Sequence, residues 1–193
     1  VEGATLVAPG IEATAAAAPH THSVTLDDHT TTALEDLARS RGVTISTVMQ
    51  FAWAVLLSRL TGQRVVTFGE TVSGRPADLD GVETMVGLFI NTLPAVVDVD
   101  PDATIGDALS RLQAAKVSVL DHQHLGLPDL VALTGVSGAL FDTLTVHESY
   151  PIDTASLESK SRGSATGELD LRAIDSRDST HLSLIHISEP TRP

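Results

Sequence analysis

Histidine residues are the first candidates for chemistry in this chain. His20 and His22, and again His122 and His124, form pairs with one residue between them, so each pair could offer imidazoles to a metal ion. No acidic or histidine partner follows either pair at helical ligand spacing. Ordinary hydrogen bonds in loops or at helix ends are therefore favoured, and the sequence predicts no metal site.

Ser137 and His147 are the other candidates for catalysis. The run Gly135-Val-Ser-Gly138 comes near the nucleophile elbow of a hydrolase, but it lacks the second flanking glycine at the required place and lies between a predicted helix and strand in the wrong order. His147 and Glu148 could form an acid/base pair, yet neighbouring residues of a strand point to opposite faces. Since no glycine-rich phosphate loop occurs either, we predict no self-contained active site and no nucleotide cofactor.

Composition limits the class of protein. At 193 residues, with 42% apolar, 19% charged and 3% aromatic residues, the chain has room for one domain with an aliphatic core. A net charge of −13 with scattered Lys and Arg argues against a nucleic-acid partner. No apolar run approaches the roughly 18 residues of a membrane helix, and no signal peptide is indicated. The lack of cysteine fits a reducing compartment, so a cytoplasmic location is expected.

The hydrophobic pattern predicts a layered α/β arrangement in the order β-α-α-β-β-α-α-β-β. A strand over 23–27 should lead into a helix that Asp27 or Asp28 caps and Gly42 ends. Thr44 should cap a second, buried helix that ends at Gly62. The remaining predicted elements are strands over 65–72 and 93–99, a long helix from Thr104 with Ile105, Leu109, Leu112 and Leu120 on its inner face, a short helix over 127–133, and strands over 141–146 and 169–174.

We divide the chain into three parts. Residues 1–22 are expected to be a connecting segment, because 8–19 are rich in Pro, Gly and Ala, and residues 23–181 form one lobe. Residues 182–193 are similar to one translated frame of a sequencing-library adapter, so we expect them not to be native. The alternative for that tail is a natural strand followed by a Pro-terminated end. The first residue is Val1 rather than Met, which indicates a fragment.

Six sequence blocks resemble the condensation domains of nonribosomal peptide synthetases. They are Leu56-Leu-Ser-Arg-Leu-Thr-Gly62, Phe68-Gly-Glu-Thr-Val-Ser-Gly-Arg-Pro76, Val86-Gly-Leu-Phe-Ile-Asn-Thr-Leu-Pro94, His122-Gln-His-Leu-Gly-Leu-Pro128, the strand from Leu140 to Pro151, and Arg177-Asp-Ser-Thr-His181. The resemblance implies a chloramphenicol-acetyltransferase-like layered sandwich of two lobes that meet at a tunnel. Residues 23–181 would be the truncated C-terminal lobe. The family's His-His-x-x-x-Asp-Gly motif, which belongs to the other lobe, does not occur here, so no catalytic residue is expected in this chain.

The resemblance also implies an activity. Such a domain forms a peptide bond between donor and acceptor amino acids that two peptidyl carrier domains hold as phosphopantetheinyl thioesters. The partners would be those carrier domains, the N-terminal condensation lobe and an adjacent adenylation domain, and this lobe itself would bind no cofactor. The alternatives are an epimerisation, cyclisation or stand-alone acyltransferase relative, and a lobe that docks carrier proteins without chemistry of its own.

One group of residues would form the floor between the two lobes, by the same resemblance. Gly87 and Asn91 would shape the loop backbone, through positive φ or close approach and through side-chain hydrogen bonds. Phe89 would pack in this floor or be a plain core aromatic, and Gln123 would face the cleft between the lobes. Without the partner lobe, the apolar residues 88–90 should be exposed, and we expect marginal stability.

A second group would latch one lobe to the other. Ser73, Gly74 and Arg75 resemble this crossover region, where Arg75 would pair with a carboxylate or form only a weak surface ion pair. Arg177 and Asp178 would form a structural pair near the end of the sheet.

Overall fold

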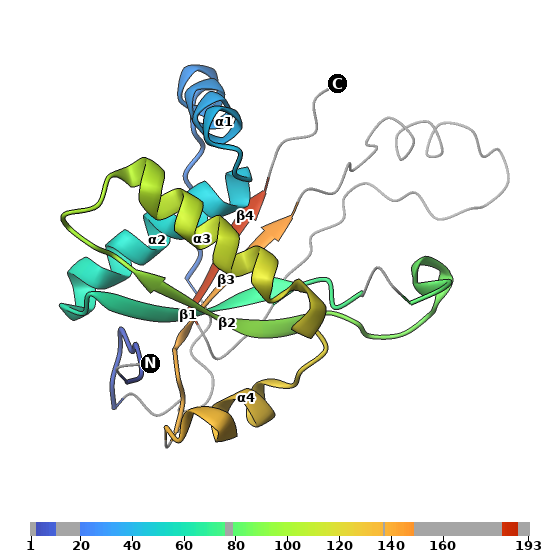
Figure 1. Ribbon diagram of the computed structural model, residues 1–193. Coiled ribbons are helices and arrows are strands. Elements are labelled where there is room, and N and C mark those ends of the chain that lie inside the picture. The colour runs from blue at the N-terminus through green and yellow to red at the C-terminus, as the bar shows by residue number, and fades with distance from the viewer. Residues whose placement is uncertain (1–2, 11–19, 76–78, 137, 149–182, 189–193) are drawn as a thin grey trace, which may run out of the picture.

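A mixed four-stranded sheet forms the centre of the computed structural model, which describes residues 3–10, 20–75, 79–136, 138–148 and 183–188 (Figure 1). The strands are β1 (Val65–Val72), β2 (Asn91–Asp98), β3 (Thr143–Glu148) and β4 (Ser183–Ser188), in the order β2-β1-β3-β4. The β1–β2 pair is antiparallel, whereas β3 runs parallel to both β1 and β4. This arrangement agrees with the predicted α/β class.

Helices cover both faces of the sheet. Figure 1 shows α1 (Asp28–Arg41), α2 (Ile45–Thr61) and α3 (Ile105–Ser118) on one side and α4 (Leu127–Thr134) on the other. Two short 3-10 turns, η1 (Val82–Thr84) and η2 (Leu120–His122), lie in the connections before β2 and after α3. None of the described helices is long and apolar enough to cross a membrane; α1 and α2 reach that length and composition only together, across a bend of 104°.

The predicted helix boundaries follow from their caps. The Asp27 carboxylate accepts a hydrogen bond from the Thr30 backbone N–H, and the Thr44 hydroxyl accepts one from Thr47. Gly42 and Gly62 end these helices with φ of 63° and 73°, a left-handed conformation that favours glycine. Both N-caps and both C-terminal glycines are confirmed.

The core lies between the sheet and the layer formed by α2 and α3. Phe68 of β1 and Leu57 of α2 are fully buried, and burial of each such side chain contributes roughly 1.5–3 kcal/mol. They pack in one cluster with Ala54, Val66, Ala95, Val97 and Leu112. Leu109 connects α3 to α1 and α2 in a second cluster with Ala38 and Val48. Apart from Phe68, both sets of buried apolar residues are aliphatic, as predicted.

The N-terminal segment packs against the sheet where β1 and β3 separate. β1 pairs with β3 only through Gly69 and Glu70. Thr5 lies beside β1 before this point, next to Thr67. Its hydroxyl donates to Gln63 Oε1 and accepts from the Thr67 N–H, both at 2.9 Å. Thr5 is 1% exposed. Residues 3–8, which we assigned to a connecting segment, are thus in contact with the lobe.

Two predictions about regular structure are wrong. Residues 20–27 form no strand, because no neighbouring strand completes a ladder with them, and Val24 is 74% exposed. The helix from Thr104 stops at Ser118, so Leu120 falls in η2 and is 51% exposed rather than on an inner face. Ile105, the first residue of α3, is also outside the core, with 63% of its surface exposed.

The last strand uses residues that we assigned to an adapter. Ser183–Ser188 forms β4 and pairs with β3 along its whole length, which agrees with the alternative of a natural strand. The adapter origin of 182–193 stays a prediction. The predicted strand over 169–174 and the pair Arg177 and Asp178 lie outside the described residues.

Candidate functional site

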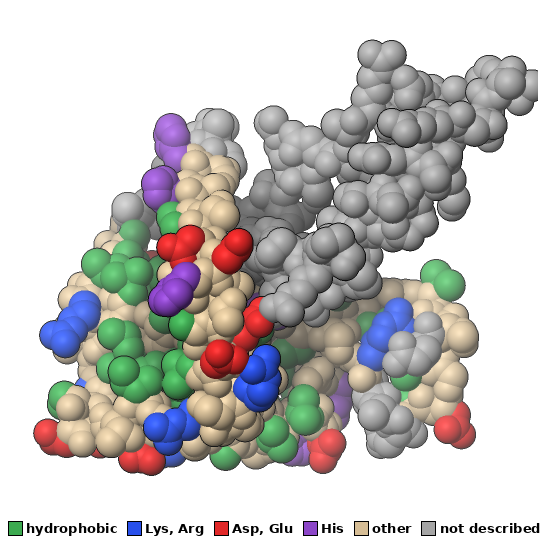
Figure 2. All heavy atoms as spheres, turned by 90° about the horizontal axis from the view of Figure 1, so that it is seen from above, with side chains coloured by type: hydrophobic (Ala, Val, Ile, Leu, Met, Phe, Trp, Pro, Cys, Tyr) green, Lys and Arg blue, Asp and Glu red, His purple; other side chains and the backbone are tan. Residues whose placement is uncertain are grey.

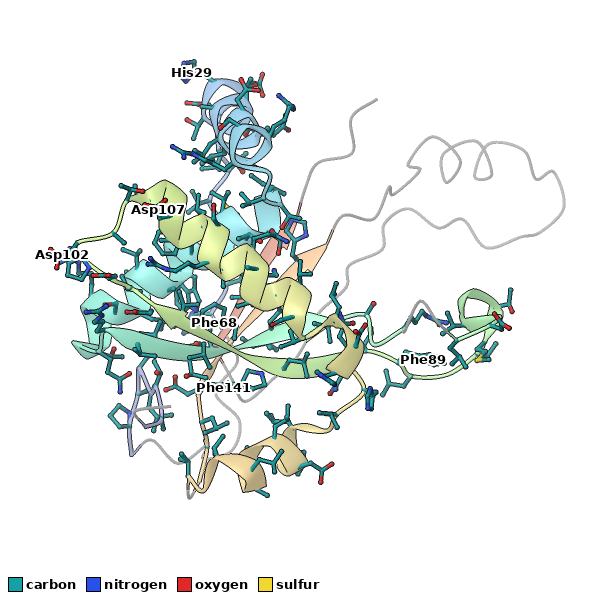
Figure 3. The ribbon with its side chains drawn as sticks, viewed as in Figure 1. His29, Phe68, Phe89, Asp102, Asp107 and Phe141 are labelled. Atoms are coloured by element: carbon teal, nitrogen blue, oxygen red, sulfur yellow. The ribbon has the colours of Figure 1, made fainter. Side chains whose placement is uncertain are left out.

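Three segments meet where the β1–β2 hairpin opens, and we call them the loop cluster: residues 73–75, 82–91 and 123–125. Val72 at the end of β1 pairs with Asn91 at the start of β2, so the loop between them leaves and re-enters the sheet at the same rung. The third segment follows η2, which continues from the end of α3. Figure 3 shows Phe89 well away from Phe68, on the long loop that extends beyond the sheet.

Asn91 fixes the third segment to the start of β2. Its Nδ2 donates to the main-chain oxygens of Gln123 and Leu125, at 2.8 and 2.7 Å. Its Oδ1 accepts from the Thr92 N–H at 2.8 Å. Both ends of the amide are therefore used for backbone contacts, which is the shaping role predicted for this residue.

Gly74 and Gln123 form the second junction of the loop cluster. The Gly74 N–H donates to Gln123 Oε1 at 3.3 Å. Gly74 is buried and has a φ of 62°, and a Cβ built on it would lie 1.8 Å from the main-chain oxygen of Phe89. Both the left-handed backbone and this close approach exclude any other residue here without rearrangement.

Arg75 holds the segment 82–91 of the loop cluster through backbone carbonyls. Its guanidinium donates to the oxygens of Val82 and Met85. Its Cζ also lies 4.3 Å from the centroid of the Phe89 ring, a cation–π arrangement. We predicted a carboxylate partner; the partners that the structure describes are carbonyls and a ring, because the guanidinium fork matches the carbonyls around the η1 turn.

Ser73 and Gly87 complete the set of predicted loop residues. A Cβ at Gly87 would lie 3.4 Å from the Phe89 ring Cε2, an ordinary van der Waals contact, and the φ of Gly87 is outside the left-handed region. The structure therefore shows neither of the two predicted reasons for a glycine at this position. Ser73 is exposed beside Gly74. The structure thus brings Gly74, Arg75, Gly87, Phe89, Asn91 and Gln123 together.

The outer side of the loop cluster is apolar and exposed. Val86, Leu88 and Ile90 are 103%, 89% and 60% exposed. We expected residues 88–90 to be exposed; Phe89 instead is half-buried, under the Arg75 guanidinium. Met85 and Val86 belong to the same surface and were missed, although an apolar run in a loop bounded by glycine was the available signal. Exposed apolar patches of this kind mark interaction surfaces.

The histidine pairs form no metal centre among the described side chains. His20, His22 and His122 are exposed, as is His124 of the loop cluster, and no group of three or more potential ligands occurs among the described side chains. Lys and Arg are scattered over the face that carries α1 (Figure 2). Ser137 and the Glu148 side chain lie outside the described parts.

A cluster of charged side chains lies at the opposite end of the β1–β2 hairpin. Arg64 Nε donates to Asp98 Oδ1 at 2.7 Å, and Asp100 Oδ2 lies 3.3 Å from Arg64 Nη2. The hydrogen bond from Arg64 holds the pKa of Asp98 below its ordinary range. All three groups lie far from the loop cluster in the hairpin register, so they do not serve it.

The geometry of the loop cluster suits positioning rather than proton transfer. Its polar side chains, Arg75, Asn91 and Gln123, bond to backbone groups within the cluster. The side chains of Met85, Val86, Leu88 and Ile90 face outward, whereas Val82 is buried. Such an arrangement can hold a loop rigid against a second surface. Its exposed Ser73 and His124 form no described hydrogen bond with each other, so the described residues give no nucleophile–base pair.

Comparison with known proteins identifies the relatives of this chain. The family model described as "Condensation domain" matches residues 10–184. Chondramide synthase cmdD of Chondromyces crocatus is 47% identical over 139 residues, which are 71% of this chain and 4% of that protein. Surfactin synthase subunit 3 of Bacillus subtilis is 39% identical over 136 residues, 70% of this chain and 11% of that subunit.

Solved structures give the same picture of the fold. The first condensation domain of the calcium-dependent antibiotic synthetase, in complex with a substrate analogue, superposes with a TM-score of 0.63 and 25% identity. The match covers 78% of this chain and 32% of that one. The condensation domain from the monacolin K polyketide synthase MokA matches with a TM-score of 0.60 at 21% identity, which concerns the fold alone. The chain thus has the chloramphenicol-acetyltransferase-like fold of these domains.

Proposed function

The chain belongs to the condensation-domain family, and from this premise we propose that residues 23–181 are the C-terminal lobe of a condensation domain of a nonribosomal peptide synthetase. Two observations support the assignment to one lobe. The chain covers about a third of the solved condensation domain, 32%, and the apolar outer side of the loop cluster has no cover among the described residues. The chain spans only 4% of chondramide synthase, so the activity of the whole protein is part of the proposal.

The proposed reaction is aminolysis of a thioester. The amine of the acceptor amino acid attacks the thioester carbonyl of the donor, a C–N bond forms, the C–S bond breaks, and the donor's phosphopantetheine thiol leaves while the amine loses a proton. Holding both reactants at attack distance can supply about 7 to 11 kcal/mol of the barrier. Positioning is therefore the contribution to expect from a loop cluster whose described residues form no acid/base pair.

The loop cluster carries the proposal. The hydrogen bonds of Asn91, Gln123 and Arg75 would hold the loop cluster in shape, and the cluster would form the floor of the tunnel between the lobes. Leu88 and Ile90 would contact the N-terminal lobe. Arg75 would contribute to the contact between the lobes only indirectly, because its described contacts are with residues 82–91 of its own lobe. Ser73, exposed at the start of this loop, stays a candidate for contact with the other lobe.

Catalysis would require parts that this sequence does not include. The family's His-His-x-x-x-Asp-Gly motif is absent from these 193 residues, so we propose that this chain alone forms no peptide bond. The cofactor would be phosphopantetheine, attached to donor and acceptor carrier domains rather than to this lobe, and an adenylation domain would adjoin it. The cytoplasmic location predicted from composition stays a prediction.

A carrier-docking lobe without chemistry is the second candidate function. The exposed apolar side chains and the lack of an acid/base pair among the described loop residues favour it as much as a tunnel floor. An epimerisation, cyclisation or stand-alone acyltransferase relative would keep the same lobe and differ in the partner lobe.

Peptide formation tests these functions. The parent domain, extended upstream to include the N-terminal lobe, would be mixed with a donor and an acceptor carrier domain, each loaded with an amino acid, and the dipeptidyl product measured by mass spectrometry of the acceptor carrier. We expect product from the extended domain and none from the 193-residue chain. An extended domain that binds the loaded acceptor carrier but yields no dipeptide would instead support docking.

A further inference from the structure

Glu70 and Lys116 form an ion pair inside the lobe, at the end of the sheet that leads to the loop cluster. Lys116 Nζ lies 2.7 Å from Glu70 Oε1, and the two side chains are 18% and 15% exposed. Glu70 is on β1 and Lys116 on α3. The pair therefore joins the helical layer to the sheet.

The ammonium of Lys116 has further acceptors on α2. It donates to Gln50 Oε1 at 2.7 Å and to Ser46 Oγ at 3.3 Å, and Gln50 is 2% exposed. An ammonium has three N–H donors, and here each has an acceptor. Lys116 is thus the point at which α2, α3 and β1 are connected by directed bonds.

The two chain segments joined by this pair meet again in the loop cluster. Beyond Glu70, β1 continues to Val72 and then to Gly74; beyond Lys116, α3 ends and η2 leads to Gln123. The Gly74 N–H donates to Gln123 Oε1, and Asn91 Nδ2 donates to the Gln123 main-chain oxygen. The two segments joined by the ion pair are therefore joined a second time, through Gln123.

A charged pair at this place has a geometric consequence that an apolar contact would lack. The rest of the same interface is formed by apolar side chains such as Leu57, Phe68 and Leu112, and apolar contacts are not directional. Desolvation of two charges offsets much of their attraction, so a buried pair by itself adds little stability over an apolar pair. Its directed bonds, however, permit only one spacing of the two elements.

We propose that Glu70 and Lys116 are positioning residues, whose ion pair sets the spacing of β1 and α3 so that Gln123 can order the loop cluster. The proposal deepens the function proposed above and rests on it, insofar as the loop cluster is the floor of the tunnel. The order of the loop cluster itself can be measured on the 193-residue chain without any substrate.

Hydrogen exchange measured by NMR tests the proposal. The reporters are the amides of Gly74 and Thr92, which donate to side chains in the loop cluster. The reference amides are those of Val7 and Ala8, which donate to the Asp142 carboxylate on another part of the lobe. The variants are Glu70→Gln and the double replacement Glu70→Met with Lys116→Met. Asp98→Asn is the matched control, because it removes an ion pair at the opposite end of the same hairpin.

We expect exchange at Gly74 and Thr92 to rise about tenfold in both Glu70 variants, with Val7 and Ala8 unchanged. In the double variant this should occur while the urea midpoint of unfolding stays near that of the unmodified chain. Asp98→Asn should leave all four amides unchanged. A double variant that keeps slow exchange at Gly74 and Thr92, or a Glu70→Gln chain in which all four amides accelerate equally, would overturn the proposal.

The outcome is independent of the assay for the proposed function. If Glu70→Gln loosens Gly74 and Thr92 but the extended domain forms no dipeptide, the positioning role stands and the condensation function fails. If the extended domain forms dipeptide and the exchange does not change, the condensation function stands and the positioning role of Glu70 and Lys116 fails.

Discussion

Asn91 Nδ2 lies 2.8 Å from the main-chain oxygen of Gln123, and the Gln123 side chain in turn accepts the Gly74 N–H. This relationship connects the start of β2, the segment after η2 and the segment after β1 through two amide side chains. It makes the loop cluster one unit, with Arg75 and Phe89 stacked on its outer part. The predictions below test that unit and the contacts that support the lobe.

Asn91→Ala should destabilise the chain by about 1 to 3 kcal/mol, because two carbonyls and the Thr92 N–H lose their partner in a partly buried place. Urea unfolding followed by circular dichroism measures this change. Ser73→Ala is the matched control, since Ser73 is exposed in the same cluster, and its effect should stay within about 0.5 kcal/mol. Equal effects of the two substitutions would contradict the bonding role of Asn91.

Gly74→Ala should be more harmful than Gly135→Ala, although both glycines have a left-handed φ, 62° and 67°. A Cβ at Gly74 would lie 1.8 Å from the Phe89 oxygen, whereas a Cβ at Gly135 has no atom within 4 Å. Gly135→Ala should cost roughly 1–2 kcal/mol from the backbone alone. Displacement of Phe89 should add about 1 to 3 kcal/mol for Gly74→Ala.

The difference between these two variants isolates the close approach of Gly74 to Phe89. Phenylalanine fluorescence is weak, so the change is best read from the NMR shifts of the Phe89 ring, which should move in Gly74→Ala and not in Gly135→Ala. Two variants with the same free energy of unfolding would show that the segment around Phe89 moves aside without loss of stability.

Thr5→Val should destabilise the lobe by about 1 to 3 kcal/mol, since it keeps the shape of the side chain but removes the hydroxyl that bonds Gln63 and the Thr67 N–H. Thr5→Ser keeps that hydroxyl and should restore most of the loss. The urea midpoints of unfolding of the two variants, compared with that of the unmodified chain, measure both effects. If Thr5→Val were as stable as the unmodified chain, residues 3–8 would not be part of the lobe in solution.

Acid should weaken the Arg64–Asp98 pair. The pKa of Asp98 is lowered from its ordinary value of 3.8 by the hydrogen bond from Arg64. A depressed pKa stabilises the fold above the unfolded value, and that contribution is lost as pH falls through the folded value. Both side chains are about half exposed, 56% and 47%, so solvent screens the pair and its contribution should be small.

Unfolding in urea as a function of pH measures this contribution. The difference between the unmodified chain and Arg64→Gln should be constant near neutral pH and shrink once the pH falls below the ordinary pKa of 3.8. Salt should reduce it, because exposed charges are screened. A difference that grew as the pH fell would have the wrong sign for this ion pair.

Local signals were sufficient to predict much of the helical part of the fold. Asp27 and Thr44 cap helices and Gly42 ends one because a cap depends on residues within one turn. The strand over 23–27 was wrong because a strand needs a partner elsewhere in the chain, which its own alternation cannot supply. Ile105 and Leu120 failed because helical periodicity does not show where a helix ends: Ile105 is the first residue of α3 and Leu120 lies beyond its end at Ser118, and both are exposed.

The candidate site was predictable only in part. Family resemblance selected Gly74, Phe89, Asn91 and Gln123; in the structure Gly74 lies against Phe89, and both Gly74 and Asn91 donate hydrogen bonds to Gln123. The hydrogen-bond partners of Arg75 could not be predicted, because they are backbone carbonyls, and every residue has one whatever its type. The Glu70–Lys116 pair was missed as well, since it joins elements that are distant in the sequence and each residue alone reads as a solvated charge.

The central claim, that this chain is the C-terminal lobe of a condensation domain, is tested most directly by sequencing the genomic locus across both ends of the chain. The account predicts a His-His-x-x-x-Asp-Gly motif in the same reading frame upstream of Val1, with adenylation and carrier segments nearby. An open reading frame that begins at Val1 and encodes no such motif would contradict it, and would leave carrier docking as the function to pursue.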